Sequence, residues 1–198
     1  MLTFAIGCIL GRSAQLTALL EQCHDYAGRQ PARYVFLGNF INAGPDSRGV
    51  VETIINLQEN TANRVIALAG ENEELLRHWQ VGDNLPRWLN RGGGATLRSY
   101  SATSPQDLPA SHLAWLQRLP EVFSDQHRLF VTSESQIAPG ERRLIVVGSR
   151  GAKGPIGPPR DGGKLYLGLR AKPSEPPSAA AFASNPPEPL ARFTARPV

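Results

Sequence analysis

The chain has 198 residues, of which 41% are hydrophobic, so it is long enough for one domain with a core, and none of its apolar runs approaches the roughly 20 residues that span a bilayer. The net charge is +4, but lysine and arginine are scattered rather than clustered, so we expect neither a nucleic-acid partner nor a membrane partner. Cys8 and Cys23 are the only cysteines and neither belongs to a CxxC pair, which argues against a disulfide framework and predicts a cytoplasmic location.

The first part of the chain repeats one pattern, in which a short apolar strand is followed by a glycine loop and a helix. The strands, each with the glycine that ends it, are predicted at residues 2–6 (Gly7), 34–37 (Gly38) and 65–69 (Gly70). Ser13 is predicted to cap the first helix and Asp46 to start the second. Successive strand–loop–helix units predict an α/β fold with a largely parallel sheet. The three loops should then meet at one sheet edge, where open α/β sheets bind ligands.

The rest of the chain is predicted to hold one glycine-rich segment, one helix, three more strands and a tail. In chain order the structured segments are residues 91–100, a helix at 112–119, and strands at 128–131, 144–147 and 164–169. Ten of the 17 prolines lie from Pro155 onward, and residues 171–198 contain few large apolar side chains. We therefore predict a domain over residues 1–170 and an extended or disordered Pro/Ala-rich tail over residues 171–198.

The three glycine loops share a frame that resembles a known family. They read Gly7-Cys8-Ile9-Leu10-Gly11, Gly38-Asn39-Phe40-Ile41-Asn42-Ala43-Gly44 and Gly70-Glu71-Asn72-Glu73. The spacing resembles the calcineurin-like metallophosphoesterases, and among them the branch of bacterial serine/threonine phosphatases and diadenosine tetraphosphatases, whose motifs are GDxHG, GDxxDRG and GNHE. The resemblance covers roughly residues 3–170 and implies a metallophosphatase-like layered sandwich, with sheets flanked by helices.

The resemblance also implies where the family's ligands and catalytic groups would fall. In the first motif the family's aspartate falls at Cys8 and its histidine at Leu10. In the second motif the bridging aspartate, the next acidic or amide residue and the arginine fall at Asn39, Asn42 and Ala43. In the third motif the ligand asparagine falls at Glu71 and the catalytic histidine at Asn72, whereas Glu73 is retained. The histidines that end two later strands fall at Thr132 and Ser149.

These replacements remove most of what a two-metal site needs. The family would use two divalent ions, such as Mn or Fe and Zn, which require carboxylate and imidazole ligands from several loops. We therefore expect no metal cofactor and no catalytic residue, and predict an inactive pseudophosphatase that binds an unknown protein or phosphorylated ligand. Arg91 and Arg98 are candidates to line a residual groove, because the similar glycine-rich segment of relatives lies beside the active site.

Two alternatives stay open at this point. The chain could be an active serine/threonine phosphatase or a dinucleoside-polyphosphate phosphoesterase with an atypical metal site. It could also be a degraded chain without a selected function. The neutral replacements themselves make physical sense, since clustered carboxylates without metal repel one another and disfavour folding.

Overall fold

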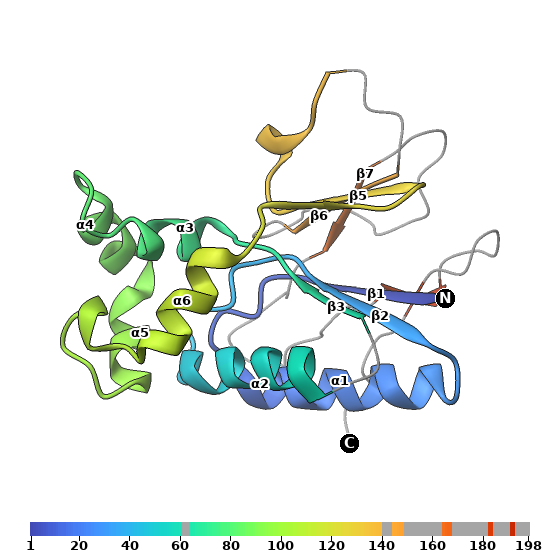
Figure 1. Cartoon of the computed structure of the whole chain (residues 1–198), viewed down its shortest axis with the longest axis horizontal. Helices are drawn as coiled ribbons and strands as arrows, with labels where there is room; N and C mark the ends of the chain where they lie inside the picture. Colours follow the sequence, from blue (N-terminus) through green and yellow to red (C-terminus); the bar gives the residue numbers. More distant parts are fainter. Residues whose placement is uncertain (61–63, 140–143, 149–163, 168–181, 184–190, 193–198) are drawn as a thin grey trace.

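The structure is a computed structural model of the chain and describes residues 1–60, 64–139, 144–148, 164–167, 182–183 and 191–192. Two β-sheets lie one over the other, and helices cover the outer face of the first sheet (Figure 1). The predicted α/β layered sandwich is therefore confirmed. Among the described helices, none is long and apolar enough to cross a membrane.

The first sheet contains the three predicted parallel strands. They are β1 (Leu2–Ile6), β2 (Ala32–Phe36) and β3 (Arg64–Ala67), in the order β3-β2-β1. β2 and β3 each begin and end one or two residues before their predicted bounds. The ladder ends early because the following loops must approach one another: a Cβ on Gly38 would lie 2.5 Å from the backbone nitrogen of Gly70.

The first sheet also extends into the segment that composition assigns to the tail. β8 (Phe182–Ala183) pairs antiparallel with β1, and β9 (Ala191–Arg192) pairs with β8. The rest of residues 171–198 lies outside the described residues, so the boundary at residue 170 stays a prediction.

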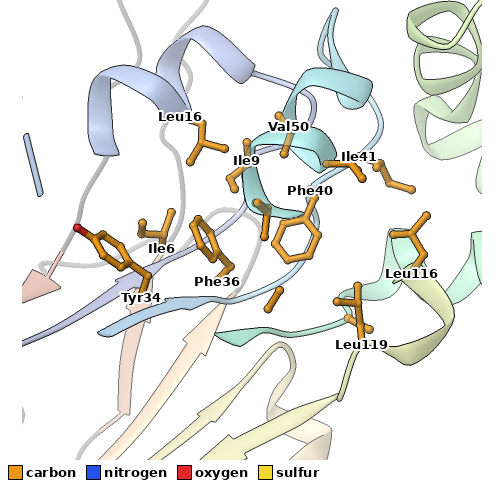
Figure 2. Close-up of a cluster of buried hydrophobic side chains, with 14 of the residues drawn as sticks. Ile6, Ile9, Leu16, Tyr34, Phe36, Phe40, Ile41, Val50, Leu116 and Leu119 are labelled. Atoms are coloured by element: carbon orange, nitrogen blue, oxygen red, sulfur yellow. The ribbon is translucent and has the colours of Figure 1, made fainter. Parts of the chain in front are cut away.

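Alternate residues of the central strands face two different hydrophobic clusters. Phe4 and Phe36 point toward the helices, whereas Ala5 and Val35 point toward the second sheet. Strands buried on both faces read as continuous apolar runs, which is why the sequence pattern identified them. Figure 2 shows the cluster on the helix side, with side chains from strands, loops and helices that include Ile6, Leu16, Phe36, Phe40, Val50 and Leu116.

The second sheet has the order β4-β5-β6-β7 and includes the later predicted strands. Its strands are β4 (Val122–Ser124), β5 (Arg128–Val131), β6 (Leu144–Gly148) and β7 (Lys164–Leu167). Phe130 and Val146 pack between the sheets. Arg33 of β2 donates to the carboxylate of Asp125, which follows β4, at 3.0 Å and so links the two sheets.

Two long helices, α1 (Ser13–Ala27) and α2 (Ser47–Asn60), begin at the predicted places. The prediction that Ser13 caps α1 is wrong: the helix begins at Ser13 itself and Arg12 occupies the N-cap position, while the Ser13 hydroxyl donates to the carboxylate of Asp46 at 2.6 Å. The predicted role of Asp46 is confirmed, since its other carboxylate oxygen accepts the N–H of Gly49 at 2.8 Å.

The shorter helices follow the third strand. They are α3 (Glu71–Arg77), α4 (Asn84–Trp88), the π-helix η1 (Leu89–Gly93), α5 (Gly94–Ser99), the 3-10 turn η2 (Pro105–Asp107), α6 (Ala110–Arg118) and the 3-10 turn η3 (Glu134–Gln136). The predicted helix at 112–119 is α6, which starts two residues earlier. The glycine-rich segment is helical rather than an open loop, and it bends at Gly92, where φ is 93°.

Candidate functional site

The three motif loops meet at one edge of the first sheet, as predicted. The N–H of Leu10 donates to the carbonyl of Asn39 at 2.9 Å, and the N–H of Gly44 donates to the carbonyl of Leu10 at 2.9 Å. The third loop closes on the second, because a Cβ on Gly70 would lie 2.4 Å from the nitrogen of Asn39. The sequence frame therefore builds one composite site, which we call the loop cluster (residues 7–11, 38–44 and 70–73).

The backbone of the loop cluster is held in an uncommon conformation. Five of the positions that correspond to family ligands or catalytic groups have φ between 38° and 74°, namely Cys8, Leu10, Asn39, Asn42 and Ala43. Left-handed backbone costs about 1–2 kcal/mol at an ordinary L-residue, and somewhat less at asparagine. Strain of this kind persists only where the surrounding fold imposes it, and it gathers at functional sites. The surrounding fold thus imposes a demanding backbone shape on the loops.

The replacement of Ala43 by glycine should measure this strain directly. Ala43 is exposed and has φ 58°, so Ala43→Gly removes a steric penalty without opening a cavity. We expect the free energy of unfolding to rise by about 0.5–1 kcal/mol after the extra flexibility of the unfolded glycine is deducted. Ala18→Gly, at an exposed position inside α1, is the matched control and should lower it by about 1 kcal/mol. Equal destabilisation in both denaturant titrations would show that Ala43 is not strained.

Glu73 holds the second and third loops together. Its side chain is fully buried, and its carboxylate accepts four backbone N–H groups, from Asn39 at 2.7 Å, Phe40 at 2.8 Å, Ile41 at 3.2 Å and Gly70 at 2.9 Å. Burial raises the pKa of Glu73, while these four donors lower it. From the sequence alone, Glu73 was known only as the residue of the third motif that matches the family's glutamate. Its contacts identify it as the clamp of the loop cluster rather than a metal ligand.

Three of the positions that correspond to the family's ligands or catalytic groups contact one another. The amide nitrogen of Asn39 lies 4.0 Å from the sulfur of Cys8, and its amide oxygen accepts the N–H of Asn72 at 3.3 Å. The amide nitrogen of Asn72 donates to the carbonyl of Ile41 at 3.2 Å. All three side chains are buried. Neutral amides and a thiol therefore occupy the space between the loops and satisfy one another.

Asn42 belongs to a second polar group that the sequence did not reveal. The N–H of Asn42 donates to the hydroxyl of Thr96 at 2.9 Å, and this hydroxyl donates to the amide oxygen of Asn42 at 3.1 Å. Ser47 lies 3.1 Å from the same hydroxyl. Thr96 belongs to α5, so the glycine-rich segment is hydrogen-bonded to the loop cluster through this residue. No local pattern marks Thr96, because its partner is 54 residues away in the chain.

Of the two predicted groove arginines, Arg91 reaches the loop cluster. Its Nε donates to the amide oxygen of Asn72 at 3.4 Å, and its guanidinium pairs with the carboxylate of Glu71 at 2.5 Å. Arg98 is exposed on α5, and no hydrogen bond or ion pair to another described residue links it to the three loops. Glu71 therefore neutralises the one predicted groove cation that the fold brings to the site.

Of the two later positions, Thr132 directly follows β5 of the second sheet. The N–H and the hydroxyl of Thr132 both donate to the side-chain oxygen of Gln136, at 2.9 and 3.2 Å, so this threonine is engaged in a local turn. Ser149 lies outside the described residues. The residue before it, Gly148, packs closely on the first sheet, since a Cβ there would lie 2.5 Å from the Cβ of Leu37.

The donor groups that the loops present do not fit a pair of divalent ions. Across the part of the chain that the structure describes, no three histidine, cysteine, aspartate or glutamate side chains gather closely enough to hold a metal. Among the described residues, Glu73 is the one buried carboxylate between the loops, and it already faces four N–H donors. Two-metal chemistry needs several carboxylate and imidazole ligands around the ions, which the described residues do not supply.

Comparison with known proteins identifies the fold. No protein-family model and no curated protein sequence matches the chain. Among solved structures, a hypothetical protein from Pyrococcus horikoshii OT3 is similar with 17% identity and a TM-score of 0.66, over 98% of this chain and 87% of that chain. A metallophosphoesterase from Sphaerobacter thermophilus is similar with 16% identity and a TM-score of 0.59, over 98% and 88% of the two chains.

A third similar structure is provisionally assigned as a diadenosine tetraphosphatase. Its identity is 16% and its TM-score 0.58, over 98% of this chain and 94% of that chain. Identities this low establish the arrangement of the backbone and not the chemistry. Together with the sheet order and the convergent loops, they show that this chain has the metallophosphoesterase fold.

Proposed function

We propose that this chain is a pseudophosphatase, which has the metallophosphoesterase fold, binds a partner through the loop cluster and hydrolyses no phosphoester. The contacts among Cys8, Asn39 and Asn72 carry the proposal. In a two-metal enzyme such positions would present charged or imidazole donors to the ions. Here they hold neutral side chains that bond to each other and to backbone.

The charges at the rim favour a protein partner over a small phosphorylated ligand. Recognition of a phosphate usually relies on a guanidinium that is free to make two parallel hydrogen bonds. The guanidinium of Arg91 is paired with Glu71, and the family's arginine position holds the exposed Ala43. A phosphate would have to displace Glu71, whereas a protein surface can pair with both charges at once. The retained strain of the loops would then serve to present a fixed surface.

The proposal predicts a protein without stoichiometric metal and without turnover. Purified protein would be analysed for metal by mass spectrometry and assayed with p-nitrophenyl phosphate in added Mn²⁺. We expect no turnover above the buffer blank and the same thermal midpoint with Mn²⁺ as with EDTA. Bound metal, together with turnover that EDTA abolishes, would contradict the proposal and would place the ligands among residues that the structure does not describe.

The same samples distinguish a stably folded pseudophosphatase from a degraded chain that no longer folds cooperatively. A pseudophosphatase should unfold cooperatively without metal, with loss of far-UV and near-UV signals at the same temperature. A chain that keeps far-UV signal but shows no near-UV signal and binds a hydrophobic dye would instead be a molten state.

A further inference from the structure

The outer edge of the first sheet is open at β3. Among the described strands, β3 pairs only with β2. The N–H of Leu68 donates to the carbonyl of Phe36 at 2.9 Å and therefore faces β2. Because successive residues of a strand direct their N–H groups to opposite sides, those of Val65 and Ala67 face away from β2. The next outward N–H, that of Ala69, donates to the carbonyl of Pro120 at 2.8 Å, outside any sheet. β3 thus presents backbone groups with which an extended chain can pair.

A groove of about 310 Å³ runs beside this edge. Its walls include Ala67, Trp115 and Leu119, from β3 and the end of α6. Gln58 bridges the groove, because its amide oxygen accepts the indole N–H of Trp115 at 2.7 Å and its amide nitrogen reaches the carbonyl of Val65 at 3.4 Å. That last bond is long, so a strand that entered the groove could replace it at little cost.

The charges around the groove indicate what would bind there. Arg64 begins β3 and Arg118 lines the groove, and both are exposed. Neither arginine forms an ion pair with another described residue. Two free cations attract an acidic segment and disfavour pairing with a second copy of the same edge, which would bring like charges together.

We infer that β3 is a docking edge, to which an extended acidic segment of a partner protein adds as a further strand. Backbone hydrogen bonds to Val65 and Ala67 would supply affinity, an apolar side chain would contact Trp115 and Leu119, and carboxylates would pair with Arg64 and Arg118. This surface is separate from the loop cluster. The inference therefore stands or falls independently of whether the loops hydrolyse anything.

The test uses the full chain and a fluorescein-labelled octapeptide of alternating glutamate and valine. Fluorescence anisotropy would give the affinity for the wild type, for the Arg64→Glu/Arg118→Glu variant and for the Arg48→Glu/Arg87→Glu variant. The last is a matched control, because it changes the net charge equally at exposed sites outside the groove. We expect about tenfold weaker binding for the first variant and unchanged binding for the control.

A second readout locates the peptide. Hydrogen exchange at the amides of Val65 and Ala67 should slow when the octapeptide saturates the protein. An octapeptide with proline at two consecutive central positions should protect them more weakly, because in either register one proline lacks the N–H that would donate to a carbonyl of β3. No binding, or equal loss of affinity in both charge variants, would overturn the inference. Slow exchange of the same two amides in a dimer without peptide would also overturn it, because a second copy of the chain would then occupy the edge.

Discussion

Glu73→Gln is expected to lower the free energy of unfolding by about 3–5 kcal/mol, far more than an ordinary loss of charge. One carboxylate oxygen of Glu73 accepts the N–H groups of Phe40 and Ile41, and the other accepts those of Asn39 and Gly70. A glutamine side chain has one oxygen and one NH₂ group. Whichever way it turns, the NH₂ group faces two backbone donors and leaves them unpaired in a fully buried site.

The measurement is denaturant unfolding of Glu73→Gln beside Glu71→Gln, which makes the same chemical change two residues away. The Glu71 side chain is half exposed and pairs with Arg91, so its replacement should cost no more than about 0.5–1 kcal/mol. If the two variants lose the same stability, Glu73 does not clamp the loops.

The layered fold was predictable because short continuous stretches of the sequence encode its strands. Apolar runs of four or five residues, each ended by a glycine, located the parallel strands within one or two residues. The convergence of the three loops followed from the general geometry of parallel sheets. Gly38 and Gly70 show why the pattern is dependable: their backbones are too close for any side chain, so the sequence must keep glycine there.

The contacts that hold the site were not predictable, because they join residues far apart in the chain. Thr96 meets Asn42 and Ser13 meets Asp46 across more than 30 residues, and no periodic pattern encodes such pairs. The left-handed backbone at Leu10 and Ala43 was hidden for a different reason, since neither residue type favours it. Local preference failed at positions where the surrounding fold imposes a strained loop shape, which is where such conflicts are expected.

Returning carboxylates to two of the substituted positions should be strongly and cooperatively destabilising without metal. The sulfur of Cys8 and the amide nitrogen of Asn39 are 4.0 Å apart in a buried site. Two carboxylates at about that separation repel by roughly 4 kcal/mol at an effective dielectric constant of 20. Cys8→Asp/Asn39→Asp should therefore lose about 2–4 kcal/mol more than the sum of the two single variants at pH 8.

The pH dependence of this coupling tests its electrostatic origin. Each carboxylate raises the folded-state pKa of the other above its unfolded value, so the penalty is absent at pH values where both groups are protonated and grows as pH rises through the folded pKa. The coupling should be smaller at pH 5 than at pH 8. A coupling that does not change between these two pH values would point to a steric conflict rather than to charge.

Added Mn²⁺ then tests whether the strained loops have the backbone geometry of a metal site. If the backbone still holds the geometry of a metal site, the ion should bind the two new carboxylates in the folded state alone and restore part of the lost stability at pH 8, with EDTA reversing the gain. The single variants and the wild type should not respond. Recovery would show that ligand loss, rather than loop collapse, separates this chain from a metal-binding relative. If Mn²⁺ has no effect on the double variant, the loops have lost more than their ligands, and the strain at Leu10 and Ala43 would then serve the partner surface alone.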